Sequence, residues 1–260
     1  MSNATYNKAI DYFALESASS NALKLKSSAE NRSIQTASGT NTYGDVKVVD
    51  AYGETAAPSA EYDVVDELEH DPSSAGTTLV TLGTVNSPTG IAKPVVLGSL
   101  SISTQNGSAP SISASGQMVQ SGAVQLRAYK LPAFTLSPRH RAQDFLGLVS
   151  IKKGSNAASA IDDYGLESVN AQFPIAFTLA QPQGVVMNYD IHGDMATVDY
   201  TMNWYSATAP TIELTQAATA LGATMASVAD RSDPDNGYTQ YTWQVSFPLV
   251  GEEYVAPSGT

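Results

Sequence analysis

The sequence predicts a mainly β protein, built as two related β-sandwich or barrel-like domains with one or two short helices. Large apolar and small polar side chains alternate in several short segments, and residues typical of tight turns separate these segments. One stretch of the chain also resembles another. A strand places successive side chains on opposite faces, so the alternation indicates sheets with one buried face.

The clearest predicted strand is residues 197–204. Large apolar side chains take every second position there, ending at Trp204, while Thr, Asp and Asn take the others. Three further segments alternate in the same way: residues 241–247, 124–128 and 100–103. The turn signals are Asn106-Gly107 and Asp235-Asn236-Gly237, whose residue types tolerate the positive φ of tight turns.

Two segments are predicted to be helical. In residues 3–19, Tyr6, Ile10 and Phe13 recur at the spacing of one helix face. Residues 216–226 are dense in alanine, which favours helix. Most of the remaining chain is predicted to be strands and turns.

An internal resemblance points to a duplication. Residues 100–123 align with residues 200–223 without a gap, and Ala109-Pro110-Ser111-Ile112 matches Ala209-Pro210-Thr211-Ile212. Small residues are common in this chain, so the match is either chance or the trace of two related domains. If the chain is duplicated, the halves should superpose with Pro110 and Pro210 at equivalent turns.

A duplicated chain divides into three parts. Residues 1–42 form an N-terminal helix and arm, residues 43–150 a first β domain with a long acidic loop, and residues 151–260 a second β domain. Residues 152–156 are interpreted as the linker between the two domains, because they combine charge, glycine and small polar residues.

The composition favours a protein that associates with copies of itself. Charged residues make up 15% of the 260 residues, against about a quarter in typical soluble domains. A surface with so little charge suits a homo-oligomer whose subunits cover one another. The net charge of -12 makes this an acidic protein and disfavours nucleic-acid recognition. The absence of cysteine excludes disulfide frameworks and a cysteine nucleophile.

Charge is unevenly distributed along the chain. Residues 45–71 carry nine carboxylates against Lys47, whereas residues 72–143 carry no Asp or Glu. Such runs either solvate a face or let the acidic segment of one subunit meet the basic segment of the next. The candidate subunit contacts are Asp63, Asp66, Glu67, Glu69, Arg127, Lys130, Arg139 and Arg141.

No set of residues converges on a catalytic or metal site. The chain lacks a G-x-S-x-G elbow and a phosphate-binding loop, and no histidine has a second one at metal-ligand spacing. Residues 190–194, which include His192 between two carboxylates, are interpreted as a polar hairpin tip. Residues 233–237 begin like a calcium loop, but the glycine comes one position early, so a turn is predicted. We therefore expect no enzyme activity, cofactor or metal.

These features together resemble the tail tube proteins of tailed bacteriophages. The shared features are an early amphipathic helix, short alternating strands, a long polar loop, low charge and an acidic balance, and residues 101–116 have the same character. The resemblance covers most of the chain and rests on pattern and composition. It implies tube domains of two packed β-sheets, rings of six domains stacked head to tail, and a continuous channel. Where the domain is duplicated, three chains make a ring of six.

The resemblance implies a virion structural protein with no catalytic residues. Its partners would be itself, in trimeric or hexameric stacked rings, and other tail proteins, with DNA as non-specific cargo in the lumen. An acidic lumen would let DNA slide because it repels phosphate. No signal peptide or membrane span is visible, so we expect synthesis in the host cytoplasm and a final place in the virion tail.

Three alternatives stay open. The first is another virion component, such as a capsid decoration or tail completion protein. The second is a carbohydrate-binding or adhesin β-sandwich, in which Tyr200 with Trp204 and Tyr241 with Trp243 would stack on sugars instead of forming the core. The third is an enzyme with a site that sequence motifs do not reveal.

Overall fold

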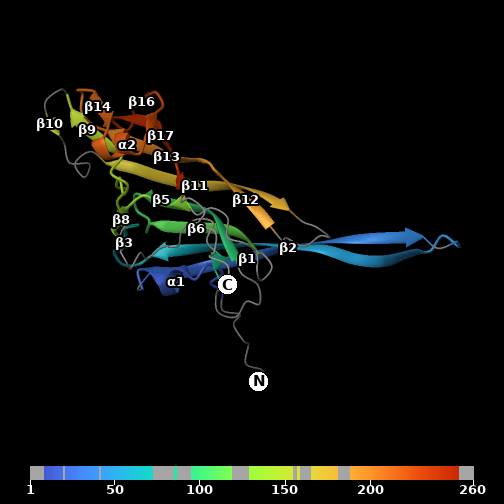
Figure 1. Cartoon of the computed structure of the whole chain (residues 1–260). Helices are drawn as coiled ribbons and strands as arrows, with labels where there is room; N and C mark the ends of the chain where they lie inside the picture. The colour runs from blue at the N-terminus through green and yellow to red at the C-terminus, as the bar shows by residue number, and fades with distance from the viewer. Residues whose placement is uncertain are drawn as a thin grey trace, which may run out of the picture.

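The computed structural model describes residues 9–19, 21–40, 42–72, 85–86, 95–118, 129–154, 157–158, 165–180 and 188–251. The protein is mainly β, as predicted, and its centre is one large antiparallel sheet (Figure 1). Strands take up most of the described chain, and both helices are short. The predicted strand at residues 124–128 lies outside the described residues.

Eleven strands form the large sheet. Its main path runs β1-β2-β6-β5-β11-β13-β17-β15, with β4 attached to β5, β12 to β11 and β16 to β17. The strands are β1 (Leu23–Thr40), β2 (Val46–Val64), β4 (Val85–Asn86), β5 (Val95–Gln105), β6 (Ser111–Met118), β11 (Leu166–Ala180), β12 (Asn188–Gly193), β13 (Met195–Trp204), β15 (Thr224–Met225), β16 (Ala229–Asp233) and β17 (Tyr238–Pro248).

Short elements cover one face of this sheet. They are α1 (Leu15–Ala18), α2 (Gln216–Ala220), β3 (Leu68–His70) paired with β8 (Phe134–Leu136), β9 (Val149–Lys153) paired with β10 (Ala157–Ala158) and β14 (Pro210–Leu214), and β7 (Tyr129–Lys130) paired with β18 (Val250–Gly251). Their apolar side chains share a single hydrophobic cluster with those of the large sheet. The molecule is therefore a layered β structure around one core.

The predicted alternation is confirmed in the central strands. Every second side chain of β13 from Ala196 to Trp204 is buried, and β17 repeats this from Trp243 onward. Tyr200 and Trp243 face each other across the two strands, with stacked rings 5.2 Å apart. These aromatic side chains belong to the core, because removing their large apolar surface from water stabilises the fold.

The predicted N-terminal helix is mostly wrong within the described residues. Only Leu15–Ala18 are helical, and Ala14 before them has a left-handed backbone with φ 55°. The Asp11 carboxylate accepts hydrogen bonds from the backbone N–H groups of Leu15 and Glu16 and from the Tyr62 hydroxyl. This local capping and the burial of Phe13 against the sheet stop a regular helix from continuing through the segment.

Two further local predictions need correction. Residues 188–193 form β12 and pair with β11, so residues 190–194 are not a hairpin tip. Lys152 and Lys153 belong to β9, and the turn that follows uses Gly154 at φ 68°. Both segments are short and polar, which is typical of turns. Hydrogen bonding to a neighbouring strand nevertheless places them in the sheets. The predicted turns at Gly107 and Gly237 are confirmed, each with positive φ.

The large sheet consists of two four-strand units with the same strand order. The first unit is β1, β2, β5 and β6, and the second is β11, β13, β15–β16 and β17. In each unit the first strand pairs with the second, the second with the last, and the last with the third. The units join where β5 pairs with β11.

Two irregularities in pairing recur at equivalent places in both units. The register of β1 on β2 shifts between Leu25 and Ser27, and that of β11 on β13 shifts between Leu166 and Ser168. β5 has a further shift against β6, and the break between β15 and β16 lies at the equivalent position on β17. Bulges are specific features of a strand, so their recurrence supports the structural equivalence of the units.

This repeat is not the one predicted from residues 100–123 and 200–223. That alignment pairs β5 with β13, which flank β11 on opposite sides, and β6 with β14, which pairs with β9 outside the large sheet. Pro110 and Pro210 therefore do not stand at equivalent turns. The alignment failed because small residues and alternation recur in many strands of this protein. The predicted domain boundaries stay a prediction.

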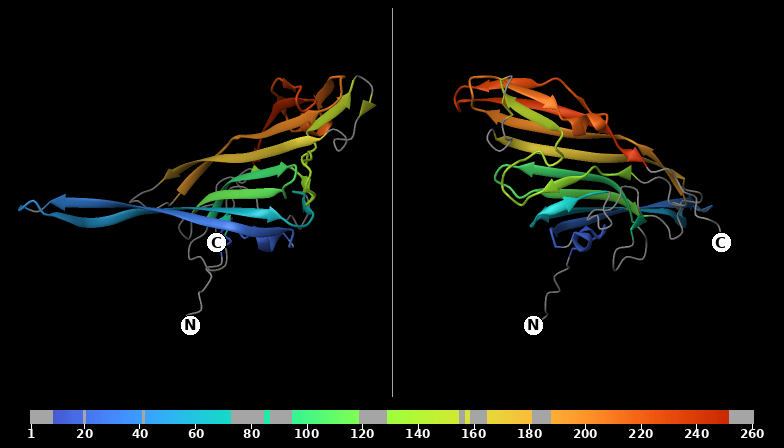
Figure 2. Two further views of the ribbon diagram at one scale, coloured as in Figure 1. Left: turned by 180° about the vertical axis from the view of Figure 1, so that it is seen from behind. Right: turned by 60° about the vertical axis from the view of Figure 1, so that its left-hand side comes forward.

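Both units begin with a hairpin that reaches beyond the neighbouring strands. β1 and β2 stay paired out to Thr40 and Val46, whereas β6 faces β2 only from Ser59 to Asp63. β11 likewise continues past β13 and pairs with β12. Both hairpins extend toward the same side of the molecule (Figures 1 and 2). Residues 34–54 are called the first arm below.

Candidate assembly surfaces

The face of the large sheet opposite the core is lined by small polar side chains. On β5 and β6 these are serines, on β11 Ser168, Asn170 and Gln172, and on β13 and β17 Thr, Asp, Asn, Gln and Ser. They are partly or fully exposed, whereas their neighbours along each strand are buried. We call this surface the polar face.

Charge is one-sided in the middle of the polar face, whereas the edge strands carry Lys26 and, opposite Gln240, Arg231. On β2, β6, β5, β11, β13 and β17, its described side chains include the carboxylates of Glu61, Asp63 and Asp199 but no lysine or arginine. Lys26 at the sheet edge forms ion pairs with Glu61 at 2.9 Å and Asp63 at 3.8 Å. The middle of the face therefore offers little attraction to an anion such as DNA phosphate.

Cross-strand hydrogen bonds hold these side chains flat. Ser103 Oγ donates to Asn170 Oδ1 at 2.6 Å, and Gln244 Nε2 donates to Asp199 Oδ1 at 2.8 Å. A shallow groove of about 390 Å³ crosses β1, β2, β6 and β5, lined mainly by serine and alanine. Pairs of this kind satisfy the hydrogen bonds of polar side chains within the sheet, so few long side chains project from the face.

The first arm exposes side chains on a two-stranded ribbon. Ile34 is 56% exposed, and Val46 is 71% exposed. A two-stranded ribbon without a covering layer has marginal stability on its own. The arm is thus a candidate for contact with another molecule.

Two strand edges are also open. Within the described residues, no strand pairs with the outer edge of β1 or with the outer edges of β15 and β16. Near its start β1 is closed off, because the Ser19 hydroxyl and the Glu16 carboxylate accept hydrogen bonds from Leu23 N and Leu25 N. The remaining edge offers backbone groups for pairing with another chain.

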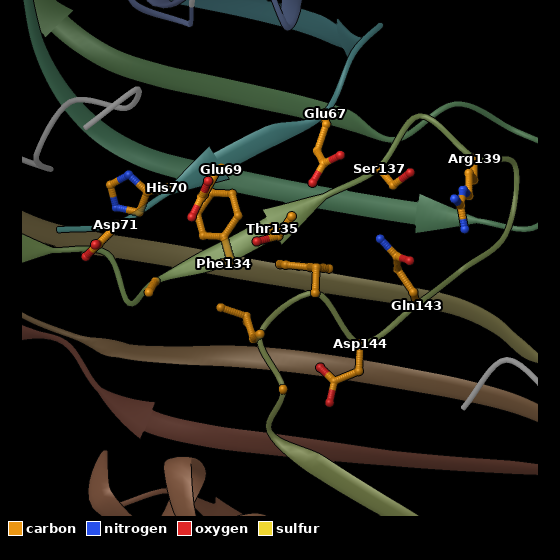
Figure 3. A pocket seen from close by; sticks show the side chains of 14 residues that line it. Glu67, Glu69, His70, Asp71, Phe134, Thr135, Ser137, Arg139, Gln143 and Asp144 are labelled. Atoms are coloured by element: carbon orange, nitrogen blue, oxygen red, sulfur yellow. The ribbon is translucent and has the colours of Figure 1, made fainter. Parts of the chain in front are cut away.

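A cavity of about 850 Å³ lies beside β3 and β8 (Figure 3). Glu67, Glu69 and Arg139 line it, so one carboxylate-rich and one basic segment of the same chain come together there. Asp144 also lines the cavity and accepts hydrogen bonds from the Tyr200 hydroxyl at 2.9 Å and Val149 N at 2.9 Å. Burial raises the pKa of Asp144, and these donors offset part of that rise.

His70 lines the cavity from β3 and is 4% exposed. Neither ring nitrogen makes a hydrogen bond in the described structure, and the ring lies 5.1 Å from that of Phe134. Burial lowers the pKa of His70, while the Leu131 carbonyl and Asp71 oppose this only in part. A buried neutral imidazole packed on an aromatic ring fits a core residue rather than a ligand group.

The predicted subunit contacts fall into separate places. Asp63 lies on β2 on the polar face, Asp66 and Glu67 lie in the exposed turn before β3, and Glu69 is exposed on β3. Lys130 is exposed on β7, and Arg139 and Arg141 are exposed in the loop after β8. Arg127 lies outside the described residues. Their role between subunits stays a prediction.

Sequence reasoning missed the polar face as a surface and the open strand edges. The alternation of serine at residues 99, 101 and 103 and at residues 111, 113 and 115 was visible. Which strands stand side by side was not, because that depends on long-range pairing.

The described residues contain no group of three His, Cys, Asp or Glu side chains placed to hold a metal ion. Neither α1 nor α2, the helices of the described part of the chain, has the length and apolar character that a membrane crossing requires. Comparison with models of known protein families and with curated proteins finds no match for this sequence.

Proposed function

We propose that this chain is a structural subunit that assembles into stacked rings around a hollow channel, as a phage tail tube does. The observation that carries the proposal is the polar face. A sheet with one face covered by its own chain and the other lined by small polar and acidic side chains suits the wall of an aqueous channel. DNA would pass such a wall without binding, because carboxylates repel phosphate.

The open edges and the two extended hairpins, β1–β2 and β11–β12, support assembly from copies of the same chain. Exposed strand edges invite pairing, and a closed ring removes them. Both hairpins extend to the same side of the molecule, where they would reach the neighbouring ring (Figure 2). Each chain carries two four-strand units, so three chains would supply a ring of six units.

Electron microscopy of the purified protein at rising concentration, with light scattering for mass, tests the proposal. Rings or tubes with an open channel are the expected result, and the mass of one ring gives the number of chains. Compact particles without a channel would favour the capsid decoration or tail completion alternative.

The carbohydrate-binding alternative has less support from the described residues. Tyr200, Trp204 and Trp243 are each buried to 4% exposure or less, so they offer no stacking surface to a sugar. Tyr241 is partly buried and packs against the core.

A further inference from the structure

The pairing registers give a residue-by-residue equivalence between the two units. The matching bulges make Ser27 of β1 equivalent to Ser168 of β11, because each is the first residue after the shift. The pairing of the third strand with the last makes Ala229 of β16 equivalent to Ser101 of β5, since Thr242 and Ser113 are the equivalent partners.

The junction between the units therefore has a counterpart at the ends of the sheet. Inside the chain, the third strand of the first unit, β5, pairs with the first strand of the second unit, β11, from Ser99↔Pro174 to Gln105↔Ser168. At the ends of the sheet, the equivalent strands are β16 and β1, and both outer edges are open in the described structure. Antiparallel alternation along the sheet gives these two strands opposite directions, as β5 and β11 have.

We infer that β16 of one copy pairs with β1 of the next copy in the register of the internal β5–β11 junction. The inference rests on the proposed self-assembly and specifies its contact. The expected pairs are Ser27↔Asp233, Ser28↔Ser232, Ala29↔Arg231, Glu30↔Asp230 and Asn31↔Ala229. Each chain would give its β16 edge to one neighbour and its β1 edge to the other. Because these two surfaces differ, the contact is heterologous and can close a ring.

The way in which the β1 edge is closed off fits this register. The side chains of Ser19 and Glu16 occupy the edge only at Leu23 and Leu25, which precede the bulge. The equivalent part of β11 also lies outside its pairing with β5, which begins at Ser168. The residues whose backbone Ser19 and Glu16 block are therefore ones that the junction does not use. Ile10 and Tyr12 also contact β1 within the expected register, but they bind the side chains of Ser28 and Glu30.

The side chains at this contact are compatible with pairing. Residues 229–232 of β16 are all exposed, as are Ala29 and Asn31 of β1. Glu30 would face Asp230 of the next copy, but Arg32 forms an ion pair with Glu30 on the same strand. In the expected register Arg32 lies diagonally from Asp230, within the reach of a long side chain, so it would neutralise both carboxylates.

A pair of cysteines tests the junction, since the natural chain has none. The test variant carries Ala29→Cys and Arg231→Cys in one chain and is oxidised under assembly conditions. Non-reducing electrophoresis is expected to show a ladder of covalent oligomers. If β16 meets β1 in this register, the cysteine at position 29 of each copy lies within disulfide distance of the cysteine at position 231 of the next, so links continue from copy to copy.

Two matched variants calibrate the result. Ser103→Cys with Asn170→Cys places the same pair at the internal junction, where the side chains now lie 2.6 Å apart, and should close within a monomer. Ala29→Cys with Thr219→Cys moves one cysteine to exposed α2 and should give no ladder beyond dimers.

The outcomes separate this inference from the proposed function. Rings or tubes that form in the microscope but give no ladder, while the internal pair closes, would overturn the β16–β1 junction and leave self-assembly standing. A monomer at every concentration with no ladder would overturn both.

Discussion

At the scale of single residues, Gly116 of β6 leaves no room for a side chain. A Cβ atom added there would collide with the Val96 carbonyl oxygen and lie 2.9 Å from Phe13 Cε1. Backbone cannot yield as a flexible side chain does, so Gly116→Ala should lower the free energy of unfolding by about 1–3 kcal/mol. Urea unfolding followed by circular dichroism measures it. Ser113→Ala, on the exposed face of the same strand, is the control; equal midpoints for both variants would contradict the prediction.

A second residue-scale prediction concerns His70 and pH. Its folded-state pKa is lowered from 6.5 by burial, so the unfolded chain takes up a proton at a higher pH than the folded chain does. The free energy of unfolding should therefore fall as the pH drops below about 6.5 toward the folded-state pKa. Above about pH 6.5 this group should have no effect on it. His70→Phe should flatten this part of the stability profile, measured by urea unfolding between pH 7 and 5.

The exposed residue His140 supplies the matched control for that experiment. His140→Gln should leave the profile as in the natural chain. An unchanged loss of stability on acidification in His70→Phe would assign the effect to other groups.

At the scale of elements, the first arm can be replaced by a short turn. Ser33 and Thr55 face each other in the β1–β2 register, so an Asn-Gly turn can replace residues 34–54. The shortened chain should keep its circular dichroism spectrum and its urea midpoint, because the buried residues of β1 and β2 remain. It should fail to form stacked assemblies in electron microscopy. Normal tubes from the shortened chain would show that the arm is dispensable.

Sequence patterns predicted the strands at residues 100–103 and 197–204 because burial on one face leaves a period of two. They could not predict that β5 and β13 stand on either side of β11, since pairing is decided by contacts far apart in the chain. The helical spacing of Ile10 and Phe13 predicted a helix that the structure does not contain, and the cause is again packing between distant parts of the chain. Phe13 is buried by the sheet and Ile10 is 45% exposed, so tertiary packing rather than helix periodicity places them.

At the scale of the whole molecule, the basic loop after β8 is a candidate for contact between copies. Arg139→Glu with Arg141→Glu should weaken association, and most strongly at low salt, where screening between exposed charges is least. Light scattering across a salt series measures the effect. Unchanged association would mean that these side chains solvate the surface or act only within the cavity that Arg139 shares with Glu67 and Glu69.

The polar face makes a second prediction at this scale, because it lines the channel of the proposed tube. Ser113→Cys puts a single thiol on that face, and Thr219→Cys puts one on exposed α2 in the covering layer. In the monomer, both thiols should react with a small maleimide and with a maleimide carried on a large protein. In assembled tubes, the small reagent should still reach both, since the channel is aqueous.

The large reagent should lose access to the Ser113→Cys thiol on assembly and keep access to the Thr219→Cys thiol. The reverse pattern would place the polar face on the outside of the assembly and the covering layer within it. In that case the small polar side chains would serve an outer surface, and DNA passage along this face would no longer follow from the lack of basic groups in its middle.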